Sequence, residues 1–339
     1  MSSDSVLGDW RDRALLFENN LRRTIIGQDR IIRLITVAVF ARGHVLLQGD
    51  VGVGKTTLLR AVARGLGGSY ERVEGTVDLM PSDLVYYTYI NEQGRPCVDP
   101  GPLVKHGDAL SILFFNEINR ARPQVHSLLL RVMAERSVAA FNRVYQFPHL
   151  QVFADRNRVD KEETFDIPAA ACDRFLMEIG MELPQAAEIQ RALMFDPRFH
   201  DVDTLVGEVE SGVLPYRELN EVSATLQAEI QASSTLQDYA LHLWQATRCP
   251  QQYGIAMDGV DMEHLVQGGA SPRGMSMLVR AARVHAWLNK RAMVVPEDLQ
   301  SVYFETTAHR VFFGSVHEFR RGPLVRELLD RVIHTVAAP

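Results

Sequence analysis

The feature that most constrains how this sequence folds is a glycine-rich loop at residues 49–56, Gly-Asp-Val-Gly-Val-Gly-Lys-Thr. The loop matches the pattern G-x-x-x-x-G-K-[ST] at every fixed position. Residues 44–47 before it are typical of a short buried strand, and residues 56–66 after it have helical spacing. Strand, loop and helix in this order form a phosphate-binding unit, so the loop predicts a nucleoside triphosphate site.

Each part of the loop has a predicted chemical role. The glycines let successive backbone N–H groups turn toward the phosphates, and the following helix directs its positive end at them. Lys55 is predicted to neutralise the β- and γ-phosphates, and Thr56 to offer its hydroxyl to Mg²⁺. ATP or ADP with Mg²⁺ is therefore the expected ligand. The predicted nucleotide-binding residues here are Gly49, Asp50, Val51, Gly52, Val53, Gly54, Lys55, Thr56 and Thr57.

A second motif follows the apolar strand predicted at residues 111–115, which ends in Asn116 and Glu117. Phosphate-loop ATPases usually carry an Asp-Glu pair here, the first holding Mg²⁺ through water and the second orienting and deprotonating the attacking water. Glu117 is available for the second role. Asn116 is a predicted metal-site residue, but its side chain is neutral, so metal affinity should fall. Two interpretations of this motif are open. The protein either hydrolyses ATP slowly, or it binds nucleotide and hydrolyses it poorly.

Strand and helix patterns alternate through the first half of the chain. Helical spacing from residue 10 to residue 40 is interrupted at residues 24–28. Further strands are predicted at residues 111–115, 151–154 and 175–179. Alternation of this kind predicts an α/β fold with a mostly parallel sheet sandwiched by helices.

Two polar hairpins are predicted to interrupt that sheet. One lies around residues 89–95, and the other covers residues 138–147 with Asn142 and Arg143 in its turn.

The pattern changes after Leu183, where strand signals stop. Helices are predicted at residues 185–194, 216–231, 236–248, 273–288 and 296–309. A chain of 339 residues also exceeds what one hydrophobic core usually supports. We therefore predict two domains, an α/β nucleotide-binding core over residues 1–183 and an all-α domain over residues 184–339.

Composition limits the classes of partner. The net charge of −6 and the pI of about 6.0 give no electrostatic excess that would attract a nucleic-acid backbone. Three widely spaced cysteines form no CxxC pair, which suits a reducing compartment. The apolar stretch at residues 34–41 is far shorter than the ~18 residues of a membrane span. We expect a cytoplasmic protein with no membrane span and no nucleic acid as its main partner.

Taken together, these motifs resemble the MoxR family of AAA+ ATPases, within the helix 2 insert clade. The resemblance runs from about residue 21 to residue 310 and is carried by several segments. They are residues 26–28, 43–47, 78–84, 101–103, 116–121, 173–177 and 269–273. The resemblance implies an AAA+ core followed by an α-helical lid.

The resemblance also implies roles for further residues. Ile26, Gly27 and Gln28 would border the adenine, and Asn157 would be sensor 1, which holds the attacking water. Arg174 would be the arginine finger that reaches across a subunit boundary, and Arg273 would be sensor 2. The family commonly has Thr-Gln-Asn-Pro around sensor 1, whereas residues 155–158 here read Asp-Arg-Asn-Arg.

The function that the resemblance implies is ATP hydrolysis in a ring, expected to be a hexamer, that remodels, activates or assembles a partner protein complex. A von Willebrand factor A domain protein is the expected adaptor, and the two hairpins would face the ring pore and partners. Two alternatives stay open. One is an ATP-binding ring scaffold with weak or no hydrolysis because of Asn116, and the other is a DNA-translocating, helicase-like motor.

Overall fold

The computed structural model describes residues 3–157 and 164–339 of the chain. Its centre is a five-stranded sheet in the order β2-β5-β8-β1-β9, with every pair of neighbours parallel. The strands are β1 (His44–Gly49), β2 (Ser69–Glu74), β5 (Leu110–Asn116), β8 (Gln151–Arg156) and β9 (Phe175–Met181). The predicted α/β fold with a parallel sheet is confirmed.

Helices cover both faces of this sheet. Side chains alternate between the two faces along each strand, and on both faces they are apolar and need to be buried. Phe114 and Phe153 pack into one hydrophobic cluster with the helices α1 to α3, whereas Phe115 and Ala154 pack into a second cluster with α4. These helices are α1 (Ser3–Thr24), α2 (Asp29–Phe40), α3 (Lys55–Leu66) and α4 (Pro123–Glu135).

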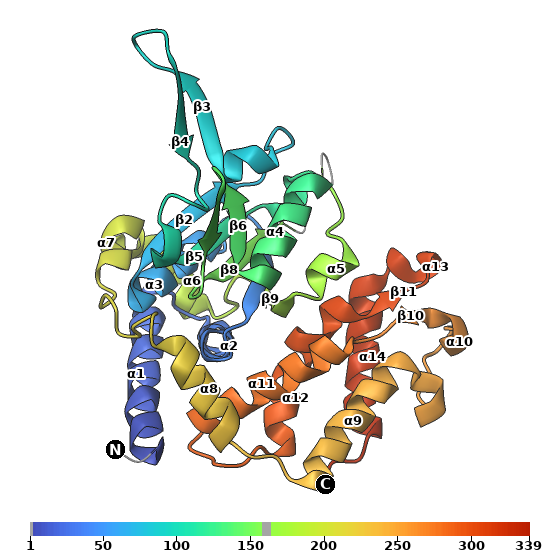
Figure 1. Cartoon of the computed structure of the whole chain (residues 1–339). Coiled ribbons are helices and arrows are strands. Elements are labelled where there is room, and N and C mark those ends of the chain that lie inside the picture. The colour runs from blue at the N-terminus through green and yellow to red at the C-terminus, as the bar shows by residue number, and fades with distance from the viewer. Residues whose placement is uncertain (1–2, 158–163) are drawn as a thin grey trace.

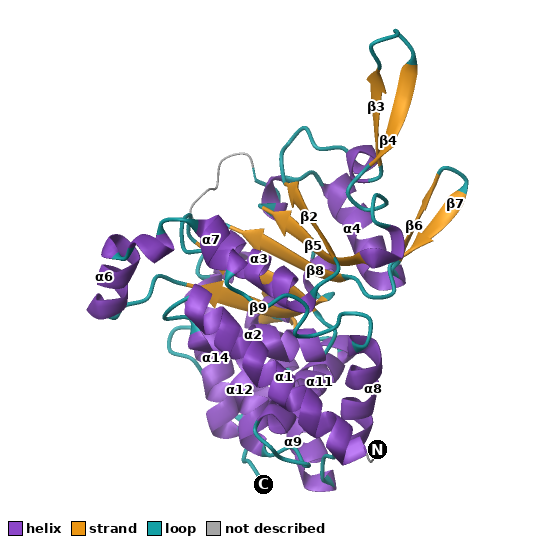
Figure 2. Cartoon of the chain, turned by 90° about the vertical axis from the view of Figure 1, so that its left-hand side faces the viewer, coloured by secondary structure: helices purple, strands orange, loops and turns teal. Residues whose placement is uncertain are grey.

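Two hairpins project from the body of the molecule, as Figure 2 shows. They are formed by β3 (Tyr86–Ile90) with β4 (Pro96–Pro100), and by β6 (Ser137–Ala140) with β7 (Arg143–Gln146). Phe141 and Asn142 form the second turn, with φ of 51° and 58°. The predicted turn at Asn142 and Arg143 is wrong by one residue, because the strand register pairs Arg143 with Ala140 inside the ladder.

The rest of the chain is mainly helical, and its helices from α8 onward lie at the opposite end from the first hairpin (Figure 1). Its helices are α6 (Ala187–Phe195), α7 (Val202–Gly207), α8 (Leu219–Glu229), α9 (Ser234–Arg248), α10 (Met262–Leu265), α11 (Pro272–Leu288), α12 (Pro296–Thr307), α13 (Ser315–Glu318) and α14 (Arg321–Thr335), and the one-turn α5 (Ala169–Cys172) precedes β9. The expectation of no strands after Leu183 is wrong in one detail. The short strands β10 (Val266–Gly268) and β11 (Phe312–Phe313) pair antiparallel.

Aromatic packing joins the helical part to the first two helices. The rings of Phe40 and Trp287 lie 4.8 Å apart between centroids, and Trp10 meets Phe40 edge-on at 6.3 Å. The Trp287 indole N–H also donates to the Leu7 carbonyl at 3.1 Å. One hydrophobic cluster thus runs from α1 to α14, and the domain boundary at residues 183 and 184 stays a prediction. Among the described residues, no helix combines the length and apolar character needed to cross a bilayer.

Candidate nucleotide-binding site

The glycine-rich loop occupies the turn between β1 and α3, where backbone geometry requires glycine. Gly52 and Gly54 have φ of 82° and 92°, a region that other residues rarely adopt. A Cβ on Gly49 would lie 2.4 Å from the Met181 carbonyl oxygen, so β9 passes too close for a side chain. The loop therefore begins against β9 and ends at the N-terminus of α3, which points its unpaired N–H groups into the turn.

A pocket of about 300 Å³ opens beside this loop. It is lined by residues from the loop, from α3 and from the ends of β5 and β8, namely Val51, Gly52, Val53, Gly54, Lys55, Thr56, Thr57, Asn116, Glu117, Asp155 and Asn157. The pocket thus brings together most of the predicted nucleotide-binding residues, both predicted metal-site residues and two of the four predicted catalytic residues.

Lys55 is the best-connected side chain of the pocket. It is 8% exposed, and its ammonium donates to the Gly49 carbonyl at 2.7 Å and to Asn157 Oδ1 at 2.7 Å. It also lies 3.3 Å from Asp155 Oδ2. A buried ammonium with these acceptors is held where a phosphate would arrive.

Glu117 and Asn157 lie in direct contact in the same pocket. Asn157 Nδ2 donates to Glu117 Oε1 at 2.8 Å, while Glu117 Oε2 lies 3.0 Å from Arg120 Nε. Glu117 has φ of 53°, in the left-handed region that residues other than glycine rarely adopt. Asn157 therefore bridges Lys55 and Glu117, which is the arrangement that a water-positioning amide needs.

Asp155 is a pocket residue that the sequence analysis did not assign. Its carboxylate is 1% exposed and accepts the Glu117 backbone N–H at 2.5 Å. Burial raises the pKa of Asp155, against the opposing effects of the Glu117 N–H and of Lys55. Its neighbour Arg156 points to the other face of the sheet and pairs there with Glu178. The sequence signal for Asp155 was a charged residue at the end of an otherwise apolar strand. The sequence does not show which face of the sheet Asp155 lies on, because that depends on the strand register.

The pocket suits a magnesium ion that is bound mainly through phosphate and water. Its possible ligands are the oxygens of Thr56, Asn116, Glu117 and Asp155, and oxygen is the ligand type that Mg²⁺ prefers. Asn116 Nδ2 donates to Glu74 Oε2 at 2.6 Å, which leaves its amide oxygen as an acceptor. No group of three or more His, Cys, Asp or Glu side chains among the described residues forms a complete metal site by itself.

The predicted adenine-bordering residues lie outside this pocket, against the segment that follows β9. Gln28 Nε2 donates to the Glu182 carbonyl at 2.6 Å, and Gly27 packs against Pro184 and Ile189. Gly27 has φ of 75°, and a Cβ there would lie 2.9 Å from Pro184. This segment directly follows Met181, which pairs with Gly49 of the phosphate loop. Residues 27 and 28 therefore contact the chain segment that begins next to the loop.

Arg174 and Arg273 lie apart from the pocket, in a second cluster that we call the Asp173 cluster. It consists of Asp173, Arg174, Ser271, Arg273 and Arg310. Arg273 Nη1 lies 3.1 Å from Asp173 Oδ2, and its side chain is 51% exposed. Arg174 Nη1 donates to the Ala170 carbonyl at 2.6 Å. Arg174 follows Asp173 directly in the chain, and neither predicted catalytic arginine lines the pocket that holds Lys55.

Arg310 holds the Asp173 cluster against β9. Its Nε lies 3.2 Å from Asp173 Oδ1, its other nitrogens donate to the carbonyls of Asp173, Phe175, Leu176 and Thr306, and it is 1% exposed. Burial lowers the pKa of Arg310 to about 10, opposed by Asp173, so the guanidinium stays charged at neutral pH. Ser271 Oγ donates to the same carboxylate at 2.6 Å and caps α11.

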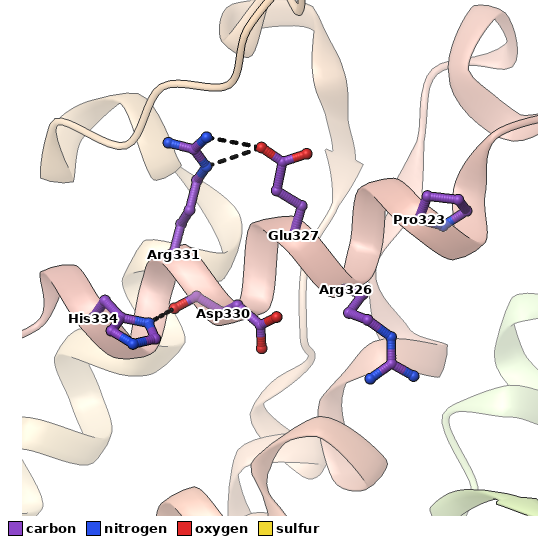
Figure 3. A pocket seen from close by; sticks show the side chains of 6 residues that line it. All are labelled: Pro323, Arg326, Glu327, Asp330, Arg331 and His334. Atoms are coloured by element: carbon purple, nitrogen blue, oxygen red, sulfur yellow. Dashed lines mark hydrogen bonds and ion pairs between the residues drawn. The ribbon is translucent and has the colours of Figure 1, made fainter.

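A different hollow, of about 420 Å³, lies on α14 (Figure 3). Arg331 pairs with Glu327 at 2.8 Å, and His334 contacts the Asp330 carbonyl of its own helix. Arg326 points away from these side chains and lies over the Phe304 ring at 4.6 Å. This hollow offers no turn of backbone N–H groups, so it does not share the phosphate-binding chemistry of the loop.

Comparison with known proteins agrees with this geometry. Residues 44–177 match the sequence model of the ATPase family associated with various cellular activities (AAA), and residues 261–331 match that of the AAA lid domain. A solved structure of a putative ATPase from Cytophaga hutchinsonii superposes with a TM-score of 0.81 at 25% identity, covering 98% of this chain and 99% of that one.

Curated relatives match this chain over most of their length. Protein MoxR of Methylorubrum extorquens is 60% identical over 336 residues, which cover 99% of this chain and 98% of the relative. Protein MoxR of Paracoccus denitrificans is 54% identical, with 99% of both chains covered. Chaperone MoxR1 of Mycobacterium tuberculosis is 33% identical, covering 94% of this chain and 80% of the relative.

Proposed function

The chain belongs to the MoxR family of AAA+ ATPases, and we propose that it hydrolyses Mg·ATP in an oligomeric ring to remodel, activate or assemble a partner protein complex. The observation that carries this proposal is the continuous contact from Lys55 through Asn157 to Glu117 beside the phosphate loop. These three residue types, in one pocket, supply phosphate binding, water positioning and proton acceptance.

In the proposed reaction the loop amides and Lys55 hold the β- and γ-phosphates. Bound Mg²⁺ would neutralise phosphate charge, with Thr56 and Asn116 as the residues on its side of the pocket. Asn157 would orient a water toward the γ-phosphorus, and Glu117 would accept its proton. Residues 26–28 would border the adenine, since they lie beside the end of β9, next to the loop.

We propose that Arg174 and Arg273 act on the nucleotide of a neighbouring subunit. Both lie away from the pocket of their own chain, and both carry guanidinium groups at a partly exposed edge. An arginine brought to the γ-phosphate at the subunit boundary would stabilise the charge that develops in the transition state. Turnover would then need neighbouring subunits in contact, in a ring that we propose to be a hexamer.

The proposed partners are a client protein complex and a von Willebrand factor A domain adaptor. Two named relatives support a chaperone-like role, since they are called Chaperone MoxR1 and Chaperone protein ClpB. The β3–β4 hairpin is a suitable contact surface, because Tyr86, Tyr87, Tyr89 and Ile90 are 39–74% exposed on it.

The proposal is tested by comparing ATP turnover of the wild-type protein with that of Lys55→Ala and Glu117→Gln, while sedimentation with ATP reports assembly. We expect Lys55→Ala to lose nucleotide affinity. Glu117→Gln should keep affinity and assembly but lose turnover by about 10²-fold or more, because it removes only the proton acceptor. A wild-type protein that binds neither ATP nor ADP in the presence of Mg²⁺ would refute the proposal.

A second candidate function is an ATP-binding ring scaffold with little hydrolysis, which the neutral Asn116 favours. Turnover of Asn116→Asp separates the two candidates. A silent wild-type protein together with an active Asn116→Asp variant supports the scaffold, whereas an active wild-type protein supports the ATPase.

A further inference from the structure

Asn116 and Asp155 end two neighbouring strands of the sheet. β5 and β8 are parallel, with Phe115 beside Ala154 in the register, so the next residues along each strand stand side by side. The residues two positions earlier, Phe114 and Phe153, both pack on the face that α3 covers. Because side chains alternate along a strand, Asn116 and Asp155 emerge on that same face, and both line the pocket beside the loop.

The contacts of Asp155 place its carboxylate between Lys55 and Glu117. One carboxylate oxygen accepts the Glu117 N–H at 2.5 Å, and the other lies 3.3 Å from the Lys55 ammonium. Glu117 has its own cationic neighbour, since its Oε2 lies 3.0 Å from Arg120 Nε. Asp155 thus provides a buried negative charge between the phosphate-binding lysine and the backbone of the proposed base.

We propose that Asp155 supplies, from the end of β8, the negative charge that Asn116 does not provide at the end of β5. This inference rests on the proposed function, and it makes Asp155 a positioning residue for the magnesium–nucleotide complex. When Lys55 contacts phosphate, the Asp155 carboxylate can accept hydrogen bonds from water bound to the ion. It also keeps the Glu117 backbone in its left-handed conformation.

The proposed role of Asp155 requires its negative charge, whereas a purely structural role requires only a hydrogen-bond acceptor. An amide at residue 155 would still accept the Glu117 N–H, because Asn has a carbonyl oxygen at the same place. Only the negative charge would be lost. A role in local structure therefore predicts little effect of Asp155→Asn, whereas a role in holding magnesium predicts a large one.

The test measures ADP affinity with Mg²⁺ and with EDTA, and takes the ratio of the two as the magnesium-dependent gain. The variants are Asp155→Asn, Asn116→Asp, and the double variant that carries both changes. We expect Asp155→Asn to lose about tenfold or more of the gain, as removal of a residue behind a metal ligand typically does. The double variant should recover it, because the charge returns to the neighbouring strand. Asn116→Asp alone measures what a carboxylate at residue 116 adds while Asp155 is present, and it is the reference for the double variant.

The inference is overturned if Asp155→Asn keeps the full gain, or if the double variant does not recover it. Thermal unfolding of each variant checks that the comparison is made on folded protein, and Asp155→Thr is a second neutral variant if the amide unfolds the chain. If magnesium raises the ADP affinity of the wild-type protein and of Asp155→Asn by the same factor, this inference alone is refuted. A wild-type protein with no nucleotide affinity refutes the proposed function instead.

Discussion

The pocket beside the phosphate loop and the Asp173 cluster both present cationic side chains suited to phosphate, but their surroundings differ. In the pocket, Lys55 is buried and bonded to Asn157, Asp155 and the loop backbone, all within one chain. In the Asp173 cluster, Arg310 is buried, whereas Arg273 is half exposed at the edge of the molecule.

The difference indicates how the work is divided. The pocket carries the residues that we propose to bind nucleotide and position water, and contacts within one chain hold them in place. In the Asp173 cluster, Arg273 is held by Asp173 and keeps an exposed guanidinium, which is the arrangement of a group that can act on another molecule. We therefore propose that the two regions are complementary halves of one composite site, which would form where two copies of the chain meet.

The largest expected effect comes from Arg174→Ala. This variant should lose turnover by about 10³-fold while keeping ADP affinity within about twofold, because an arginine finger would stabilise only the transition state. Steady-state hydrolysis and equilibrium binding measure the two quantities. Arg331→Ala on α14 is the matched control, since that arginine pairs only with Glu327 of its own helix among the contacts described. Equal turnover in Arg174→Ala and wild type would remove Arg174 from the composite site.

Next in size is the effect of Asp173→Ala on stability. Arg310 would remain buried without its carboxylate partner, so the free energy of unfolding should fall by about 3 kcal/mol. Urea denaturation measures this change. The control is Asp203→Ala, which breaks an exposed pair with Arg60 and should cost less than about 1 kcal/mol. Similar losses in both variants would show that Arg310 does not depend on Asp173.

The smallest effect concerns His44, a buried histidine at the start of β1. His44 Nδ1 accepts the Val152 N–H at 2.9 Å, joining β1 to β8, and burial lowers the pKa of His44 to about 3. Since the unfolded pKa is near 6.5, stability from neutral His44 is complete above that value and is lost as pH falls toward 3. At pH 5 the loss should be about 2 kcal/mol.

Denaturation of His44→Gln at pH 7.5 and pH 5 measures this contribution, with the exposed His200→Gln as control. The acid-induced loss of stability should be smaller in His44→Gln than in the control by about that amount. His309, whose ring contacts the Phe175 carbonyl next to the Asp173 cluster, also has a pKa well below its usual value. Acid should therefore weaken both regions, and an unchanged pH dependence in His44→Gln would contradict the role of His44.

Most of the parallel sheet was predictable, because β1, β5, β8 and β9 are runs of apolar residues next to recognisable motifs. β2 was missed, since its sequence Ser-Tyr-Glu-Arg-Val-Glu mixes charges with few apolar residues, as an edge strand can. The pair β10–β11 was missed because strands of three and two residues are too short to show alternation.

The residues of the pocket were predictable to the extent that motifs name them. Their contacts were not, since strand register decides that Asp155 faces Lys55 while Arg156 faces Glu178. Tertiary packing likewise decides that Arg273 joins Asp173, a hundred residues earlier in the chain. Arg158, a further charge of the expected sensor 1 segment, lies outside the described residues. The catalytic roles of Glu117, Asn157, Arg174 and Arg273 stay predictions.

The composite site is tested most directly by mixing two inactive proteins. Lys55→Ala should not bind nucleotide in its own pocket but retains Arg174, and Arg174→Ala retains the pocket but lacks the proposed finger. If one chain completes the site of its neighbour, ATP turnover should appear on mixing, at sites that combine an intact Lys55 with an intact Arg174. A mixture that assembles by sedimentation yet stays as inactive as its two components would contradict the account.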